Sequence, residues 1–360
     1  MKVKLGNLTK IRTGKLDANA SSEDGAYPFF TCSREPLKIN TYSYECECVL
    51  VAGNGDLNVK YYNGKFDAYQ RTYIIEAKQP NVLYMPYLYY FMEKYIVELR
   101  KLAIGGVIKY IKLGNLTEAL IELPSYNQQR SLVERLEKVK SAIDKRNEQL
   151  AKLDELVKCR FVELFGDPVT NTKQYEIGPL ESIASYWNGL TYSPDDVTDE
   201  GTVVLRSSNI QNSVLDFKDT VRVNCRITDK KYVQENDILM CSRNGSAKLV
   251  GKVALIQGLK EPMAFGAFMM IIRSPLYYPY LLTYFQMPAF RLQIATAATT
   301  TINQITGNML DKIKLPIPPV SEIEVFASFV RRIDKLRIVI RQSLDEAQKL
   351  FDSLMQEYFD

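Results

Sequence analysis

Two long stretches of the chain carry apolar residues at every third or fourth position. In the first stretch the pattern runs from residue 132 to residue 164, and adding 194 to each position reproduces it from 326 to 358. Such spacing is typical of the a and d positions of a coiled coil, here with arginines at 146, 160 and 337 as polar exceptions. The apolar members of the two predicted seams are Leu132, Leu136, Val139, Ile143, Leu150, Leu153 and Val157, and Val330, Ile333, Ile340, Leu344, Phe351 and Leu354.

Each stretch predicts a helix of about 40 residues, which would be ~60 Å long at 1.5 Å per residue. An amphipathic helix of this length has to cover its apolar stripe. Pairing with a partner protein is one possibility. Pairing within the chain is favoured because the two stripes have equal length, and it predicts an antiparallel coiled coil with a globular segment at each end.

The segments outside the predicted helices repeat as well. Pro86-Tyr87-Leu88 recurs as Pro279-Tyr280-Leu281 and Gly114-Asn115-Leu116 as Gly307-Asn308-Met309, both 193 residues later. Asn54-Gly55 recurs 190 residues later, as Asn244-Gly245. A repeat of this length is too long for a solenoid unit. It predicts four segments: a globular domain at 1–122, a helix at 123–167, a second globular domain at 168–316 and a second helix at 317–360.

Local patterns inside the globular segments predict an α/β (α+β) fold. Residues 47–51 and 73–75 are expected to form strands, as are 237–241 and 268–272 in the second copy. The apolar, tyrosine-rich stretch 83–99 is interrupted by charged residues and is expected to be a buried helix rather than a membrane span.

Composition excludes several classes of protein. The 360 residues contain 46% hydrophobic and 24% charged residues with a net charge of +4, which is ordinary for a soluble protein and only weakly suggestive of nucleic acid. The six cysteines form no Cys-x-x-Cys pair and histidine is absent, so neither a metal site nor a disulfide framework is indicated. We expect a reducing compartment, the cytoplasm, and no membrane association.

The motifs of catalysis are missing too. Without histidine the commonest general base is absent, and the chain contains neither a P-loop nor the Asn/Asp-Pro-Pro-Tyr run of adenine methyltransferases. The acidic pairs Asp195-Asp196 and Asp199-Glu200 resemble a metal site, but they lie in a predicted loop where solvated carboxylates are expected. An enzyme acting through this loop is the weakest alternative. The chain is predicted to bind rather than to catalyse.

Polar and aromatic residues gather in the predicted turns of both globular segments. Arg, Asn, Gln, Ser and Thr are the side chains that grip phosphates and read base edges in DNA. The candidate binding residues are Lys15, Arg34, Asn54, Gln70, Arg71, Lys109 and Tyr110 in the first segment, and Trp187, Tyr192, Arg206, Ser208, Asn209, Arg243, Asn244, Lys248, Thr300 and Gln304 in the second.

The whole chain resembles the specificity subunits of type I restriction-modification systems. The run from Ile111 to Pro124, followed by Gln128-Gln129, is similar to the boundary between domain and helix in that family. The run from Ile302 to Glu322 is similar to the second boundary, except that Ile323 stands where the family often has Gln. Leu205-Arg206-Ser207-Ser208-Asn209-Ile210 resembles a segment common near the front of these domains.

The resemblance implies two target-recognition domains, each reading one half of a bipartite double-stranded DNA sequence. It also implies that the coiled coil sets the spacer and docks two methyltransferase subunits, and that restriction subunits join the complex. No cofactor is expected in this chain, because S-adenosylmethionine, ATP and Mg²⁺ would belong to the partner subunits. The alternative is a stand-alone coiled-coil protein that binds DNA or serves as a scaffold, with no modification partners.

Overall fold

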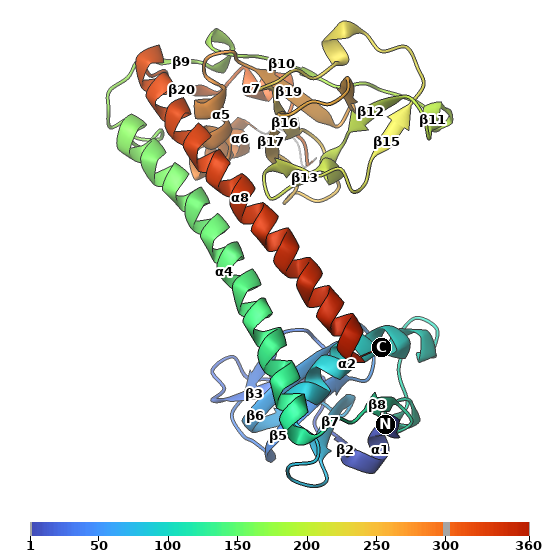
Figure 1. The fold of residues 1–360 in the computed structure, drawn as a ribbon. Coiled ribbons are helices and arrows are strands. Elements are labelled where there is room, and N and C mark those ends of the chain that lie inside the picture. The colour runs from blue at the N-terminus through green and yellow to red at the C-terminus, as the bar shows by residue number, and fades with distance from the viewer. Residues whose placement is uncertain (1, 298–302, 360) are drawn as a thin grey trace. The chain divides into compact units, whose positions relative to one another are not determined.

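The computed structural model describes residues 2–297 and 303–359, and the chain divides into two compact units. Unit 1 is formed by Met1–Glu148 and Arg341–Asp360, and unit 2 by Gln149–Ile340. The two long helices, α4 (Tyr126–Phe165) and α8 (Val320–Phe359), each contribute about half of their length to each unit (Figure 1). The predicted four segments follow the order along the chain, whereas each compact unit combines a globular part with parts of both helices.

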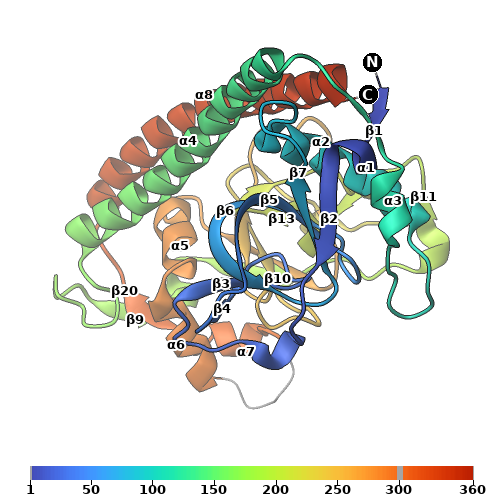
Figure 2. The ribbon, with the colours of Figure 1, turned by 90° about the horizontal axis from the view of Figure 1, so that it is seen from below.

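Unit 1 is built on a six-stranded sheet with the order β2-β7-β5-β6-β3-β4 (Figure 2). Neighbouring strands are antiparallel except for the parallel pair β3 and β6. The strands predicted at 47–51 and 73–75 lie within β5 and β7. The bounds are β2 (Thr9–Thr13), β3 (Tyr27–Phe30), β4 (Leu37–Ile39), β5 (Tyr44–Ala52), β6 (Val59–Ala68) and β7 (Thr72–Ala77).

The apolar stretch at 83–99 forms the buried helix α2 (Met85–Leu102) that the sequence predicts. Pro86 lies in its first turn, and Arg100 and Lys101 in the last turn complement the helix dipole. Tyr87, Leu88 and Met92 are buried against Val49 and Ile75 of the sheet. The remaining elements are β1 (Lys2–Lys4), α1 (Leu5–Leu8), α3 (Leu113–Thr117) and β8 (Leu120–Glu122), with β1 paired to β8. Across the described residues, every helix is too short or too polar to span a bilayer.

Unit 2 repeats this plan with a divided sheet. Four strands have the order β10-β19-β16-β17 and four more the order β11-β15-β12-β18. The single ten-residue strand β6 of unit 1 corresponds to two short strands of unit 2, β17 and β18. β17 is antiparallel to β16, as β6 is to β5, and β18 is parallel to β12, as the end of β6 is to β3. The bounds are β10 (Ser185–Asn188), β11 (Val197–Thr198), β12 (Thr202–Leu205), β15 (Val221–Val223), β16 (Ile238–Cys241), β17 (Val253–Leu255), β18 (Met263–Phe265) and β19 (Met269–Arg273).

The helix that follows the sheet is shorter in unit 2. α5 (Tyr278–Phe285) is only eight residues long, and α6 (Pro288–Ala297) starts at a proline, which cannot continue the hydrogen bonding of a preceding helix. The other elements are the hairpin β13 (Ile210–Gln211) and β14 (Val214–Leu215), the pair β9 (Ile177–Pro179) and β20 (Lys314–Pro316), and α7 (Gly307–Leu310).

Within each unit, α4 and α8 pack in opposite directions, as the equal stripes predict. In unit 2, Arg337 of α8 bonds Asp154 at 2.6 Å, while Phe326, earlier in α8, packs on Phe161, later in α4. In unit 1 the Arg146 guanidinium donates to Ser343 at 3.1 Å. All the predicted seam residues are buried or half-buried.

Three further core residues of α4 lie off the predicted seam. Phe161 and Phe165 are 0% and 2% exposed and pack against Tyr280 of α5, while Val133 is buried in unit 1. Helix α4 therefore presents two apolar faces at its ends, one to α8 and one to the globular part. A 3-4 repeat accounts only for the first of these faces.

Candidate nucleic-acid interface

The candidates of the first segment come together at one edge of the unit 1 sheet, which we call loop edge 1. It comprises residues 13–17, 31–35, 53–58, 69–71 and 104–111, which are joined by hydrogen bonds. The Lys15 amide donates to Ala68, the Gln70 amide donates to Leu16, and the Gly55 amide donates to Lys109. All seven candidates of this segment, from Lys15 to Tyr110, belong to this edge.

Several cations of loop edge 1 are free to meet a polyanion. Arg34 is paired with Asp56 at 2.9 Å, and the Gln70 side chain donates to Asp17 at 2.8 Å. Lys15, Arg71 and Lys109 are exposed and form no ion pair with any residue in 2–297 or 303–359. Unpaired exposed cations on the tips of loops are suited to phosphate contacts.

A network of backbone hydrogen bonds centred on Gly53 holds this edge. The Gly53 amide donates to the Arg71 carbonyl at 2.8 Å, and the Gly53 carbonyl accepts from the Ile111 amide at 2.9 Å. The next residue, Asn54, forms an isolated bridge with Tyr110. The end of β5, the turn before β7 and the segment 104–111 are thus tied together. We call this network edge frame 1.

Unit 2 contains the same network, edge frame 2, centred on Ser242. The Ser242 amide donates to the Phe268 carbonyl at 2.9 Å, and its carbonyl accepts from the Ile305 amide at 2.7 Å. Arg243 forms the bridge with Gln304. Three of the second-segment candidates, Arg243, Asn244 and Gln304, lie at this frame, and Lys248 is exposed in the loop that follows.

The frames correct the alignment of the two copies. Gly53 and Ser242 are 189 residues apart, so Asn54 corresponds to Arg243 and not, as the Asn-Gly match predicts, to Asn244. Strand pairing sets this register, because Val51 lies opposite Tyr73 just as Met240 lies opposite Met270. The backbone hydrogen bonds therefore define which residues correspond in the two copies, and the shared Asn-Gly dipeptide does not.

Arg206, Ser208 and Asn209 form a turn beside edge frame 2. Asn209 is fully buried, and its side-chain amide donates to the carbonyls of Asp216 and Asp219. The Arg206 guanidinium donates to both carboxylate oxygens of Asp219, at 3.1 and 3.0 Å. The neighbouring Ser207 hydroxyl accepts from Asn244 at 3.2 Å, which connects the turn to the frame. Asn209 thus shapes this turn from inside and does not reach the surface.

Three candidates lie elsewhere. Trp187 sits in β10, where its indole nitrogen donates to the Lys230 carbonyl at 2.6 Å and the Arg273 guanidinium lies 5.0 Å above its ring. Tyr192 is half-buried against a small core cluster that contains Val204. Both aromatic side chains are held by packing within unit 2. Thr300 lies outside the described residues.

Sequence reasoning missed one exposed aromatic residue at edge frame 2. Phe268 is 59% exposed, and the Arg243 guanidinium lies 5.3 Å from the centre of its ring. Its place in the apolar run 268–272 indicates a buried strand residue. The preceding Gly266-Ala267 is the one sequence signal that the strand begins only at Met269.

Other possible sites are less well formed. In the described part of the chain, no three His, Cys, Asp or Glu side chains are grouped as a metal site. The acidic loop is a capped turn, in which the Asp196 carboxylate accepts from the Ser193 amide and the Ser193 hydroxyl accepts from the Asp195 amide. The Asp196 carboxylate is thus engaged with the backbone of its own turn.

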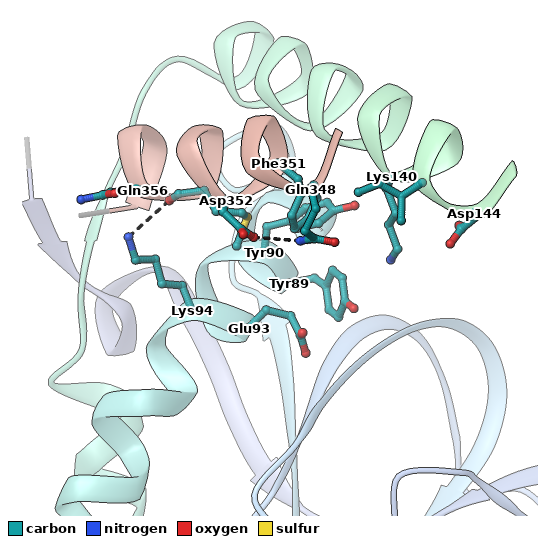
Figure 3. A pocket seen from close by; sticks show the side chains of 12 residues that line it. Tyr89, Tyr90, Glu93, Lys94, Lys140, Asp144, Gln348, Phe351, Asp352 and Gln356 are labelled. Atoms are coloured by element: carbon teal, nitrogen blue, oxygen red, sulfur yellow. Dashed lines mark hydrogen bonds between the residues drawn. The ribbon is translucent and has the colours of Figure 1, made fainter. Parts of the chain in front are cut away.

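Unit 1 also contains a cavity of about 480 Å³ between α2 and the two long helices (Figure 3). Tyr89 and Glu93 of α2, Lys140 of α4 and Phe351 of α8 contribute to its walls. Burial raises the pKa of the Glu93 carboxyl, and the charge of Lys140 opposes this shift. The cavity shares no residue with loop edge 1, so it is a separate feature of the unit.

Comparison with known proteins identifies the family. The family model described as "Type I restriction modification DNA specificity domain" matches residues 1–155 and 172–349. The chain belongs to this family. The family prediction made from the sequence is therefore confirmed, and each of the two matches covers one globular segment with most of the helix that follows it.

Relatives in the type I specificity family include the EcoDI and EcoKI specificity subunits of Escherichia coli. The first is 38% identical over 156 residues and the second 27% identical over 188 residues, which is 43% and 50% of this chain. These stretches span 34% and 39% of the relatives' own length, so each alignment covers little more than a third of the relative.

Solved structures of the specificity family share the fold. The S subunit of a type I restriction-modification system from M. genitalium superposes with a TM-score of 0.63 at 16% identity, covering 100% of this chain and 96% of that one. A chain from a study of assembly and conformational transition of the type I system gives a TM-score of 0.55 at 15% identity, covering 100% of this chain and 97% of that one. At these identities the similarity establishes the architecture of two globular parts and two long helices.

Proposed function

We propose that this chain is the DNA-reading subunit of a type I restriction-modification complex, in which units 1 and 2 each read one half of a bipartite double-stranded target. The observation that carries the proposal is the pair of edge frames. Both units of this specificity-family chain hold the same backbone network at the same place, and they display different side chains from it. Two different half-sites require such a common scaffold with different reading surfaces.

The charges of the two edges support this proposal. Lys15 and Lys109 of loop edge 1 and Lys248 of unit 2 would contact phosphates and fix the register of each unit on the duplex. Asn, Gln and Arg side chains at the frames would read base edges in the major groove.

The paired helices α4 and α8 would dock two methyltransferase subunits, and restriction subunits would join through the same complex. S-adenosylmethionine, ATP and Mg²⁺ would then enter with these partners. The long helices would also set the spacer. Seven residues inserted into each helix next to Gln149 and Ile340, where the two units divide, would add ~10 Å, or about three base pairs. An unchanged spacer in the modified sites would contradict this role.

Methylome sequencing tests the reading function directly. The host and a strain lacking this gene are compared, and the motif that loses methylation is the target. Exchanging residues 1–122 for those of another family member should then change one half-site only, and an altered second half-site would contradict the assignment of one half to each unit. Because Tyr87 and Phe91 pack against Phe359, a donor with aromatic residues at both positions is the appropriate choice.

The same experiment separates the alternative of a stand-alone DNA-binding protein. In that case the purified chain would bind DNA, and deletion of the gene would leave every methylated motif unchanged.

A further inference from the structure

The two edge frames display three side chains each from equivalent backbone positions. The residue after the frame centre is Asn54 in unit 1 and Arg243 in unit 2. The carbonyl that accepts from the amide of the frame centre belongs to Arg71 in unit 1 and to Phe268 in unit 2. The residue that forms the isolated bridge is Tyr110 in unit 1 and Gln304 in unit 2. All three positions differ in chemistry, while the hydrogen bonds that hold them remain the same.

We infer that these six residues determine which bases each unit reads: Asn54, Arg71 and Tyr110 for one half-site, and Arg243, Phe268 and Gln304 for the other. The inference rests on the proposed function, since it assigns sequence selection to particular side chains of two DNA-reading edges. It treats the remaining loop cations as contributors to affinity and not to sequence preference.

The position of these residues favours this role. The frame centres directly follow the strands β5 and β16, and the hydrogen bonds of each frame fix the other positions to them, so the side chains start from a defined place, as base recognition requires. Phe268 is 59% exposed and Tyr110 is 38% exposed, and the side chains of Arg71 and Arg243 are exposed as well. Exposed aromatic residues held on a rigid frame offer a planar surface for a base or a thymine methyl group.

Neighbouring candidates lack one or more of these properties. Arg206 is committed to Asp219, and Asn209 is buried. In unit 1, Arg34 is paired with Asp56 and Gln70 with Asp17. Lys15 and Lys248 are exposed but lie outside the frames, and a lysine ammonium is a point charge without the planar geometry that distinguishes base edges.

The chemistry of the two sets predicts different preferences. Arg243 lies over the Phe268 ring, which orders its guanidinium before DNA arrives and leaves the planar donor fork available for the O6 and N7 atoms of guanine. Asn54 has the amide that pairs with the N6 and N7 atoms of adenine. The unit 2 half-site is therefore expected to contain a guanine read by Arg243, and the unit 1 half-site an adenine read by Asn54.

Selection from a randomised double-stranded DNA library tests the inference, using the full chain assembled with methyltransferase subunits of its host. The wild-type complex should enrich a bipartite motif. Arg243→Gln should relax or change one guanine position in the unit 2 half-site, lowering its preference by about 10- to 100-fold, and leave the unit 1 half-site intact. Asn54→Ala should have the reciprocal effect.

Lys248→Gln is the matched control, because it removes an exposed cation next to edge frame 2 that lies outside the inferred set. It should weaken binding to all sequences alike and reduce the salt dependence by about one charge, with the motif unchanged. If Arg243→Gln binds too weakly for selection, the selection is repeated at lower salt, which strengthens binding to all sequences alike. The guanine position should still be relaxed.

The outcomes distinguish the two levels of the proposal. If the wild-type complex enriches no motif, the proposed function fails. If it enriches a bipartite motif that Arg243→Gln leaves unchanged, the proposed function stands and the inference about the frames is wrong.

Discussion

Tyr280 donates its phenolic hydroxyl to the carbonyl oxygen of Pro316 at 2.8 Å inside the core of unit 2. Tyr87 makes the equivalent bond to the carbonyl of Glu122 at 3.0 Å in unit 1. These are the tyrosines of the repeated Pro-Tyr-Leu motif, and their acceptors are the last residues of β8 and β20, just before the chain enters the long helices. The repeat thus preserves a link between the helix after each sheet and the entry to α4 or α8.

Replacing Tyr280 with phenylalanine should lower the free energy of unfolding by about 1–2 kcal/mol, because it leaves a buried carbonyl without a donor. Urea denaturation measures the change. Tyr278→Phe is the control, since its half-buried hydroxyl makes no hydrogen bond with the described residues, and equal losses in the two variants would contradict the role of the bond.

Gly14 and Gly189 are predicted to be intolerant of a side chain. A Cβ atom would lie 2.1 Å from the Ala68 carbonyl oxygen at Gly14, and 2.2 Å from the Gly266 oxygen at Gly189. Alanine at either position should lower the free energy of unfolding by about 1–3 kcal/mol through forced displacement of the adjoining strand. Gly245→Ala, where no atom lies within 4 Å of the added carbon, should stay within about 0.5 kcal/mol of wild type in the same denaturation experiment.

Asp237 is 1% exposed and binds Arg273 through two hydrogen bonds of 2.7 Å. Asp237→Ala should lower the free energy of unfolding by about 3–5 kcal/mol, because the guanidinium loses the carboxylate that compensates its partial burial. The double variant Asp237→Ala/Arg273→Ala should lose less than the sum of the single variants. Strict additivity in thermal or urea unfolding would show that the two side chains act independently.

The Arg222–Glu261 pair should make stability depend on pH. Hydrogen bonding to Arg222 holds the pKa of the Glu261 carboxyl below its ordinary value, which is about 4.3. The charged form is therefore favoured in the folded state, and its contribution is present above that value and is lost as the pH falls through the lowered pKa. The difference in melting temperature between wild type and Glu261→Gln should be constant from pH 7 to pH 5 and shrink below about pH 4. A constant difference down to pH 2 would contradict this origin.

The sequence predicts the long helices and their direction well, because a seam repeated over about ten heptad positions leaves few alternatives. It misses Phe161 and Phe165, since these residues face a globular core that a two-helix pattern does not contain. It misplaces the Asn-Gly correspondence by one residue, because strand register depends on partners distant in sequence. Phe268 was missed for the same reason, since whether an aromatic residue ends a strand or lies within it depends on pairing.

The candidates of the first segment lie closer together in the structure than those of the second. All seven residues of the first segment lie at loop edge 1, where Lys15, Asn54 and Gln70 each follow a strand end by two residues and Lys109 and Tyr110 come from the segment after α2. In unit 2 the sheet is divided, and Trp187, Tyr192 and Asn209 are taken up by packing and turn formation. The identity of a polar or aromatic residue in a predicted turn does not show whether its side chain stabilises the turn or extends into solvent.

Residues 341–359 complete the core of unit 1, where this part of α8 lies beside α2 (Figure 1). Phe351 packs on Tyr90 and Phe359 packs on Tyr87. A ribosome therefore delivers the first sheet early, and it delivers the part of α8 that packs on α2 only after all of unit 2 has been made. At 5–20 residues per second, the intervening 192 residues from Gln149 to Ile340 take roughly 10–40 s. During that interval the nascent chain exposes the apolar face that α8 will cover. A premature stop codon before position 341 would thus damage the unit that begins with residues 1–148.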